Sequence, residues 1–149
     1  MPAGLDVIIV DDEKSVCKTV SAIISRFYTW GDVLVFTDVD EAIAYCINRE
    51  IGIAIFVVDV YLSGKSGFTF LDAIQGRFPT VHEDTIIITG NASDDIVNMC
   101  IASNVSHLLE KPIKPFALQL AVRSIVSKYL KFAKRLLKDQ AFAESVATF

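Results

Sequence analysis

Five short runs of apolar residues, rich in β-branched side chains, recur along the chain and predict five β-strands. Their positions are residues 6–10, 32–36, 53–58, 85–89 and 107–110. Between these runs the apolar residues are spaced three and four apart, as in Val16, Val20 and Ile23, which predicts helices with one buried face. A final helix is expected from Pro115, because proline is preset for the first turn of a helix.

Strands and helices therefore alternate five times, and the strands are almost continuously apolar. This order is typical of a parallel sheet that is covered by helices on both faces. A chain of 149 residues is long enough for one good core and too short for two ordinary domains. We expect an α/β fold, a doubly wound five-stranded parallel sheet with five helices, at residues 5–128. An extension of the last helix, at residues 129–149, follows it.

The composition of the chain excludes some classes of binding partner. A net charge of -4 and a pI near 5.1 provide no basic field for direct binding to nucleic acid or to an anionic membrane surface. No stretch approaches the roughly 20 apolar residues of a membrane span, and the N-terminus has no basic leader, so we expect a cytoplasmic protein. The three cysteines, Cys17, Cys46 and Cys100, lack metal-ligand spacing and are expected to be reduced, half-buried thiols on helices.

Polar residues stand where the predicted strands end, and that edge of such a sheet is where ligands bind. Asp11 and Asp12 follow the first strand, Asp59 the third, Thr89 the fourth and Lys111 the fifth. Taken singly, Asp11 or Asp12 is equally well explained as a helix cap. Together the carboxylates repel one another unless a cation neutralises them, and hard oxygen ligands suit Mg²⁺, with Mn²⁺ as the alternative. The two histidines, His82 and His107, are expected to be surface or packing residues.

Lys111 and the Thr89 hydroxyl lie on the same predicted edge and can contact further oxygens. The cation site is therefore interpreted as a site that binds a phosphoryl group. Phosphoryl transfer needs positioned groups and positive charge for the equatorial oxygens, and a carboxylate can act as the nucleophile. The chain has no glycine-rich loop ending in Gly-Lys-Ser/Thr, so a nucleotide is not the expected donor.

In their order and spacing, these residues resemble the receiver domain of two-component response regulators, a flavodoxin-like fold. The resemblance spans about residues 5–128 and includes the segment DVYLSGKSG after the third strand. The residues that carry it are Asp11-Asp12, Asp59, Thr89 and Lys111-Pro112.

The resemblance implies a role for each residue of the site. Asp12 and Asp59 would bind Mg²⁺ directly together with the backbone carbonyl of Tyr61, and Asp11 would act through water. Asp59 would accept the phosphoryl group from a phosphohistidine on a histidine kinase or a phosphotransfer protein. Lys111 would contact a phosphoryl oxygen, and the Lys111-Pro112 bond would be cis, which an X-Pro bond tolerates at about 0.5–1 kcal/mol.

The chain departs from that pattern in places. Ser63 stands where the family usually has proline, and Leu108 stands where an aromatic residue usually moves inward with the threonine. Thr89 is expected to move toward the phosphoryl group and to draw Gly90, Asn91 and Ala92 with it, ahead of a helix that Ser93 caps. The bulky Tyr61 is expected to shield the phosphoryl group, and the alternative is a solvent-facing ring with no kinetic role.

The last helix carries apolar residues at alternating spacings of four and three, which predicts a heptad seam. We expect it to run from Pro115 to Lys138, past the domain, and to support a homodimer or serve as a linker, in preference to folding back on the core. The seam residues are Leu118, Val122, Ile125, Tyr129, Phe132 and Leu136.

Three functions remain open from the sequence. The first is a phosphoacceptor switch that catalyses only its own phosphorylation and hydrolysis, which the complete set of acids and Lys111 favours. The second is an interaction module that keeps the fold without using phosphate. The third is a Mg²⁺-dependent phosphohydrolase, which would need an acid or base near the nucleophile, where Tyr61 stands instead.

Overall fold

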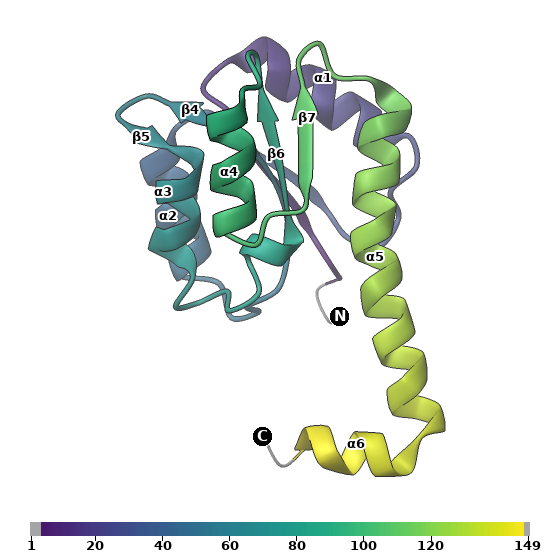
Figure 1. The fold of residues 1–149 in the computed structure, drawn as a ribbon. Helices are drawn as coiled ribbons and strands as arrows, with labels where there is room; N and C mark the ends of the chain where they lie inside the picture. Colours follow the sequence, from purple (N-terminus) through teal and green to yellow (C-terminus); the bar gives the residue numbers. More distant parts are fainter. Residues whose placement is uncertain (1–3, 148–149) are drawn as a thin grey trace.

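The computed structural model describes residues 4–147 and confirms the predicted α/β fold. Five strands form one parallel sheet in the order β2-β1-β3-β6-β7 (Figure 1). β3 lies at the centre of this sheet, so the residue at its end has a strand on either side. The strands are β1 (Val7–Val10), β2 (Val33–Phe36), β3 (Ile55–Asp59), β6 (Thr85–Thr89) and β7 (His107–Glu110).

Helices cover both faces of the sheet. α1 (Lys14–Ser25) and α5 (Pro115–Lys138) pack on one face, and α2 (Val39–Ile47), α3 (Gly67–Ile74) and α4 (Asp94–Ala102) pack on the other. The side chains of a strand alternate between the faces. In β3, Ile55 and Val57 join the core beneath α1 and α5, whereas Phe56 and Val58 join the core beneath α2, α3 and α4.

Short elements that the sequence pattern did not predict complete the fold. A hairpin of β4 (Tyr61–Leu62) and β5 (Lys65–Ser66) follows β3, and a 3-10 turn, η1 (His82–Asp84), precedes β6. A sixth α-helix, α6 (Gln140–Ala147), follows α5 after Asp139, whose extended backbone ends α5. The Asp139 side chain accepts a hydrogen bond from the Phe142 backbone N–H at 3.0 Å and so caps α6.

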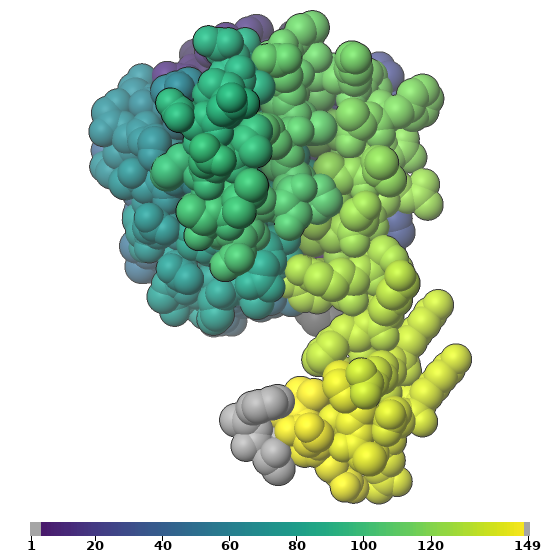
Figure 2. All heavy atoms as spheres, in the orientation of Figure 1, coloured from purple at the N-terminus to yellow at the C-terminus, as the bar shows by residue number. Residues whose placement is uncertain are grey.

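The predicted bounds of α5 are confirmed, and the helix projects beyond the body (Figures 1 and 2). It begins beside the carboxyl ends of the strands and leaves the body at the opposite end of the sheet. Its 24 residues span about 36 Å at 1.5 Å per residue. Asp84, which is 1% exposed, accepts hydrogen bonds from Lys128 and Tyr129 where α5 leaves the body.

Five of the six predicted seam residues find partners within the chain. Leu118, Val122 and Ile125 are buried in the core beneath α5, and the hydroxyl of Tyr129 donates to Asp84. Phe132 packs edge to face on Phe142 of α6, with ring centroids 5.6 Å apart. α6 therefore packs against the last turns of α5 and not on the core, and the homodimer stays a prediction.

Two further expectations concern the membrane and the cysteines. Within residues 4–147, no helix is both long enough and apolar enough to cross a membrane. Cys17, Cys46 and Cys100 are confirmed as free thiols on α1, α2 and α4, but they are buried and not half-buried as predicted.

Candidate functional site

Asp59 ends the central strand β3 and is only 4% exposed. Its Oδ1 accepts a hydrogen bond from the backbone N–H of Tyr61 at 3.1 Å, and its Oδ2 accepts one from Lys111 Nζ at 2.8 Å. The strand residues before it, Val57 and Val58, are fully buried. Asp59 is therefore fixed at the carboxyl edge of the sheet with an ammonium group beside it.

Asp11 follows β1 and is completely buried. Its Oδ1 accepts a hydrogen bond from the Glu13 backbone N–H at 2.9 Å. Its Oδ2 lies 3.1 Å from Lys111 Nζ as an ion pair, yet no donor among residues 4–147 gives it a hydrogen bond. Burial raises the pKa of Asp11 to about 6, and the charge of Asp59 adds to this effect.

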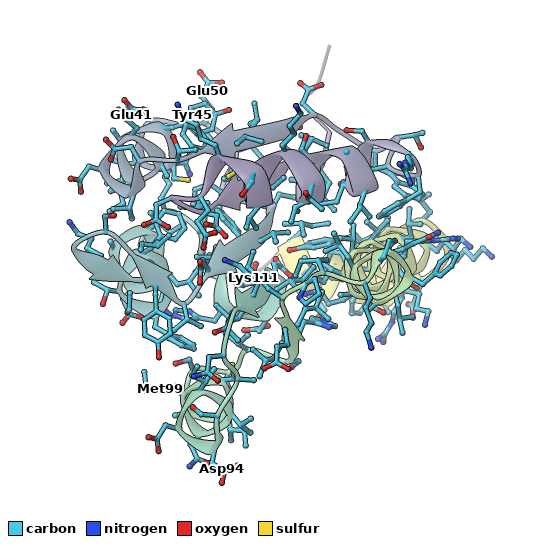
Figure 3. All side chains as sticks on the ribbon, turned by 90° about the horizontal axis from the view of Figure 1, so that it is seen from above. Glu41, Tyr45, Glu50, Asp94, Met99 and Lys111 are labelled. Atoms are coloured by element: carbon cyan, nitrogen blue, oxygen red, sulfur yellow. The ribbon has the colours of Figure 1, made fainter. Side chains whose placement is uncertain are left out.

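Lys111 follows β7 and lies over the middle of this edge (Figure 3). Its Nζ also lies 3.3 Å from Glu13 Oε1, so one ammonium serves three carboxylates. Burial alone would lower the pKa of Lys111, but its hydrogen bond to Asp59 and the negative charges of Asp11 and Asp59 raise it. The Lys111 backbone N–H donates to the Thr89 carbonyl at 2.8 Å, and the predicted cis Lys111-Pro112 bond is confirmed.

The carboxylates exceed the available positive charge. Oxygen atoms of Asp11, Glu13 and Asp59 lie within 4.8 Å of one another, with Lys111 as their shared cation. The buried Asp11 Oδ2 lacks a hydrogen-bond donor, and all the ligand atoms are hard oxygens. Such a donor set fits a divalent cation of the Mg²⁺ type. The sequence interpretation overlooked Glu13, although it directly follows the two aspartates.

Asp12 and Tyr61, two predicted cation ligands, are placed differently from Asp11 and Asp59. The Asp12 side chain is exposed, accepts a hydrogen bond from Ser63 Oγ at 2.9 Å and lies outside the 4.8 Å carboxylate group. The side chain of Tyr61 is 64% exposed, while its backbone N–H is bonded to Asp59. The structure thus brings Asp11, Asp59 and Lys111 together and leaves Asp12 at the rim.

Thr89 ends β6 beside Asp59 and is fully buried. Its Oγ1 accepts a hydrogen bond from the Asn91 backbone N–H at 3.2 Å. The following loop is held by the Ala92 N–H, which donates to Glu110 Oε2 at 3.0 Å, and Ser93 caps α4 as predicted. Leu108 packs against the core beneath α4, as expected of a residue that fills space.

The fold and this edge define a class of protein. Residues 7–123 match the response regulator receiver domain family, and the chain belongs to that family. The family supports a phosphorylation-dependent signalling switch of the two-component type. No curated protein sequence matches the chain.

Solved structures of receiver domains share the fold. The beryllofluoride-activated NtrC4 receiver domain dimer is 26% identical, with a TM-score of 0.71 over 83% of this chain and 98% of that one. A CheY-like receiver from Methanospirillum hungatei JF-1 is 19% identical, with a TM-score of 0.73 over 87% and 98% of the two chains. The chemotaxis protein CheY4 of Vibrio cholerae is 22% identical, with a TM-score of 0.70 over 83% and 99%.

Proposed function

We propose that this protein is a signalling switch that accepts a phosphoryl group on Asp59 from a phosphohistidine of a histidine kinase or phosphotransfer protein. The observation that carries the proposal is the position of Asp59, whose Oδ2 lies 2.8 Å from Lys111 Nζ in a group of carboxylates suited to a cation. A carboxylate oxygen of Asp59 would attack phosphorus. The O–P bond would form as the P–N bond of the donor breaks, and the imidazole would leave.

Each neighbour of Asp59 has a task in this transfer. Bound Mg²⁺ would offset negative charge on the phosphoryl oxygens and would be held by Asp11, Asp59 and Glu13 or Asp12, with the Tyr61 carbonyl as a further candidate. Lys111 would move from the Asp59 oxygen to a phosphoryl oxygen, since its ammonium already lies beside that atom.

Thr89 would respond to the negative charge of a phosphoryl group on Asp59. Its Oγ1 now accepts a hydrogen bond from Asn91, which leaves its hydroxyl hydrogen available for a phosphoryl oxygen. Movement of Thr89 would pull on the loop 90–92 and hence on the start of α4, which Ser93 caps. With Leu108 packed in the core, this loop rather than an aromatic side chain would carry the signal.

Incubation with acetyl phosphate and Mg²⁺, followed by intact-mass measurement, tests the proposal. We expect one added phosphoryl group, which is absent from Asp59→Asn and absent when EDTA is present. Lack of an adduct in the native protein would favour an interaction module that does not use phosphate. Steady release of phosphate without an adduct would favour a phosphohydrolase.

We further propose a homodimer in which α4 of one copy faces α5 of the other. α5 has six basic side chains and no acid, so two such helices would repel each other along their length. The first turn of α4 instead carries Asp94 and Asp95, and its outer side exposes Met99 (Figure 3) and Ile101. The outer side of α5 exposes Phe116 and Leu120, and the NtrC4 relative is itself a dimer.

Sedimentation of the phosphorylated protein separates this arrangement from pairing through the extension. We expect the full chain and a chain that ends at Lys128 to form dimers, and Leu120→Glu to stay monomeric. Loss of the dimer on truncation alone would assign it to the extension. Monomers in every sample would remove the homodimer.

A further inference from the structure

A hydrogen bond between the hairpin and the first acidic segment lies at the rim of the site. Ser63 and Gly64 form the two-residue turn of the β4–β5 hairpin, and Gly64 has a φ of +79°, a conformation that glycine adopts without strain. From this turn the Ser63 hydroxyl reaches Asp12 Oδ2 at 2.9 Å. Residues 51 positions apart in the sequence are thereby joined across the mouth of the site.

The turn that carries Ser63 is held on several sides. The Gly67 N–H donates to the Val60 carbonyl at 2.7 Å, directly below the hairpin. Lys65 Nζ donates to Asp40 of α2 at 3.0 Å, and Ser66 caps α3. The hydroxyl therefore comes from a fixed scaffold, and the exposed Asp12 side chain is the partner that can rotate.

Asp12 has a physical reason to stay at the rim in the absence of a cation. Asp11, Glu13 and Asp59 already share the single ammonium of Lys111. A fourth carboxylate would add negative charge to three that already share one ammonium, which is unfavourable. Asp12 lies outside the group of oxygens within 4.8 Å, and Ser63 supplies it with a hydrogen bond there.

We propose that Ser63 is a positioning residue that holds Asp12 away from the cation site and so lowers the affinity of the resting protein for Mg²⁺. The inference rests on the cation site of the proposed function. Because the hairpin is held in place by its own contacts, Asp12 must give up the Ser63 hydroxyl to join that site. Binding of the cation is thereby coupled to the β4–β5 hairpin, a segment next to the phosphoacceptor.

Titration of the ¹⁵N-labelled full chain with MgCl₂, without any phosphodonor, measures the affinity directly by NMR. The titration is made at constant ionic strength and about pH 8, where Asp11 is ionised. We expect Ser63→Ala to bind Mg²⁺ about threefold to tenfold more tightly than the native protein, as loss of one competing hydrogen bond predicts. Ser63→Thr, which keeps the hydroxyl, should bind as the native protein does.

Each other outcome overturns the proposal in a recognisable way. An unchanged or weaker affinity in Ser63→Ala, alongside normal binding by the native protein, removes the role of Ser63 and leaves the proposed function intact. Tighter binding by both variants shows that the hydroxyl is not the cause. Absence of binding in the native protein and in Ser63→Ala removes the cation site as well. Asp59→Asn should weaken binding, which shows that the titration reports this site.

Discussion

The Nζ atom of Lys111 lies 2.8 Å from Oδ2 of Asp59 and joins the ends of strands β7 and β3. The same ammonium lies 3.1 Å from Asp11 Oδ2, and the Lys111 side chain is 15% exposed. One buried cation thus holds two buried carboxylates together. The carboxylates outnumber this ammonium, so the site should reduce the stability of the protein unless a further cation binds there, as the proposed function requires.

Removal of this ammonium should destabilise the protein when no divalent cation is present. Lys111→Met leaves Asp11 and Asp59 without their shared partner, and we expect the free energy of unfolding in EDTA to fall by about 3–5 kcal/mol. MgCl₂ should restore part of the loss, because a bound cation neutralises the same carboxylates. Urea unfolding followed by circular dichroism measures both. Lys114→Met, at the exposed start of α5, is the control and should change little.

Replacement of Asp11 should raise the free energy of unfolding, whereas replacement of Lys111 lowers it. The size of this gain should depend on pH. Burial raises its pKa from 3.8 to about 6, so the folded protein holds this proton more tightly than the unfolded chain. The cost of ionising Asp11 therefore appears as the pH rises from 3.8 to about 6 and is complete above that range. Asp11→Asn should raise the free energy of unfolding at pH 7 in EDTA by about 1–3 kcal/mol.

That gain should shrink as the pH falls toward 3.8 and vanish well below it, where Asp11 of the native sequence is neutral in both the folded and the unfolded state. The neighbouring and exposed Asp12 supplies the matched control, since Asp12→Asn should change the free energy of unfolding by no more than about 0.5 kcal/mol. A gain that is equal at both ends of the pH range would show that burial of the Asp11 charge is not its cause.

The sheet and its edge residues were predictable from sequence because their signals are local. Apolar runs define strands such as β3, and residues that end parallel strands must meet at one edge, which places Asp59 near Lys111. The bounds of α5 followed from the same periodicity together with Pro115.

The parts that sequence did not predict depend on tertiary contacts. Two-residue strands such as β4 are too short to show a period, and the bond from Ser63 to Asp12 joins segments far apart in the chain. Glu13 was visible as a third acid, but only the position of Lys111 shows that its side chain turns into the site. The heptad pattern of α5 could not distinguish a partner chain from the protein's own core and α6.

Tyr61 should control how long the phosphoryl group persists. Its backbone N–H donates to Asp59 Oδ1, and the residue, two positions after the acceptor, is 64% exposed. A hydrolytic water must reach the acceptor, and we expect the bulky side chain to hinder its approach. We expect Tyr61→Ala to speed autodephosphorylation about tenfold, which corresponds to about 1.4 kcal/mol in the barrier. Tyr61→Phe keeps the bulk and should leave the rate unchanged. Decay of the adduct followed by intact mass measures all three proteins, and equal rates would make the ring solvent-facing only.

Asp84 should fix the point at which α5 leaves the body. It is 1% exposed and accepts hydrogen bonds from Lys128, Tyr129 and Thr80, the last at 2.9 Å. Asp84→Ala removes the acceptor for all three, and we expect the free energy of unfolding to fall by about 2–4 kcal/mol. Amide hydrogen exchange in the second half of α5 should quicken as well, because the helix loses the hydrogen bonds that Lys128 and Tyr129 make to the body at Asp84.

Two further variants test this prediction more closely: one removes a single hydroxyl group, and the other is a surface control. Tyr129→Phe removes only one donor to Asp84 and should cost about 0.5–1.5 kcal/mol. Glu83→Ala, at the exposed neighbouring position of η1, should leave both stability and exchange unchanged. If Asp84→Ala lowers stability while exchange in α5 stays at its native rate, Asp84 supports the start of β6 alone. The direction of α5 would then be set by the apolar contacts of Leu118, Val122 and Ile125.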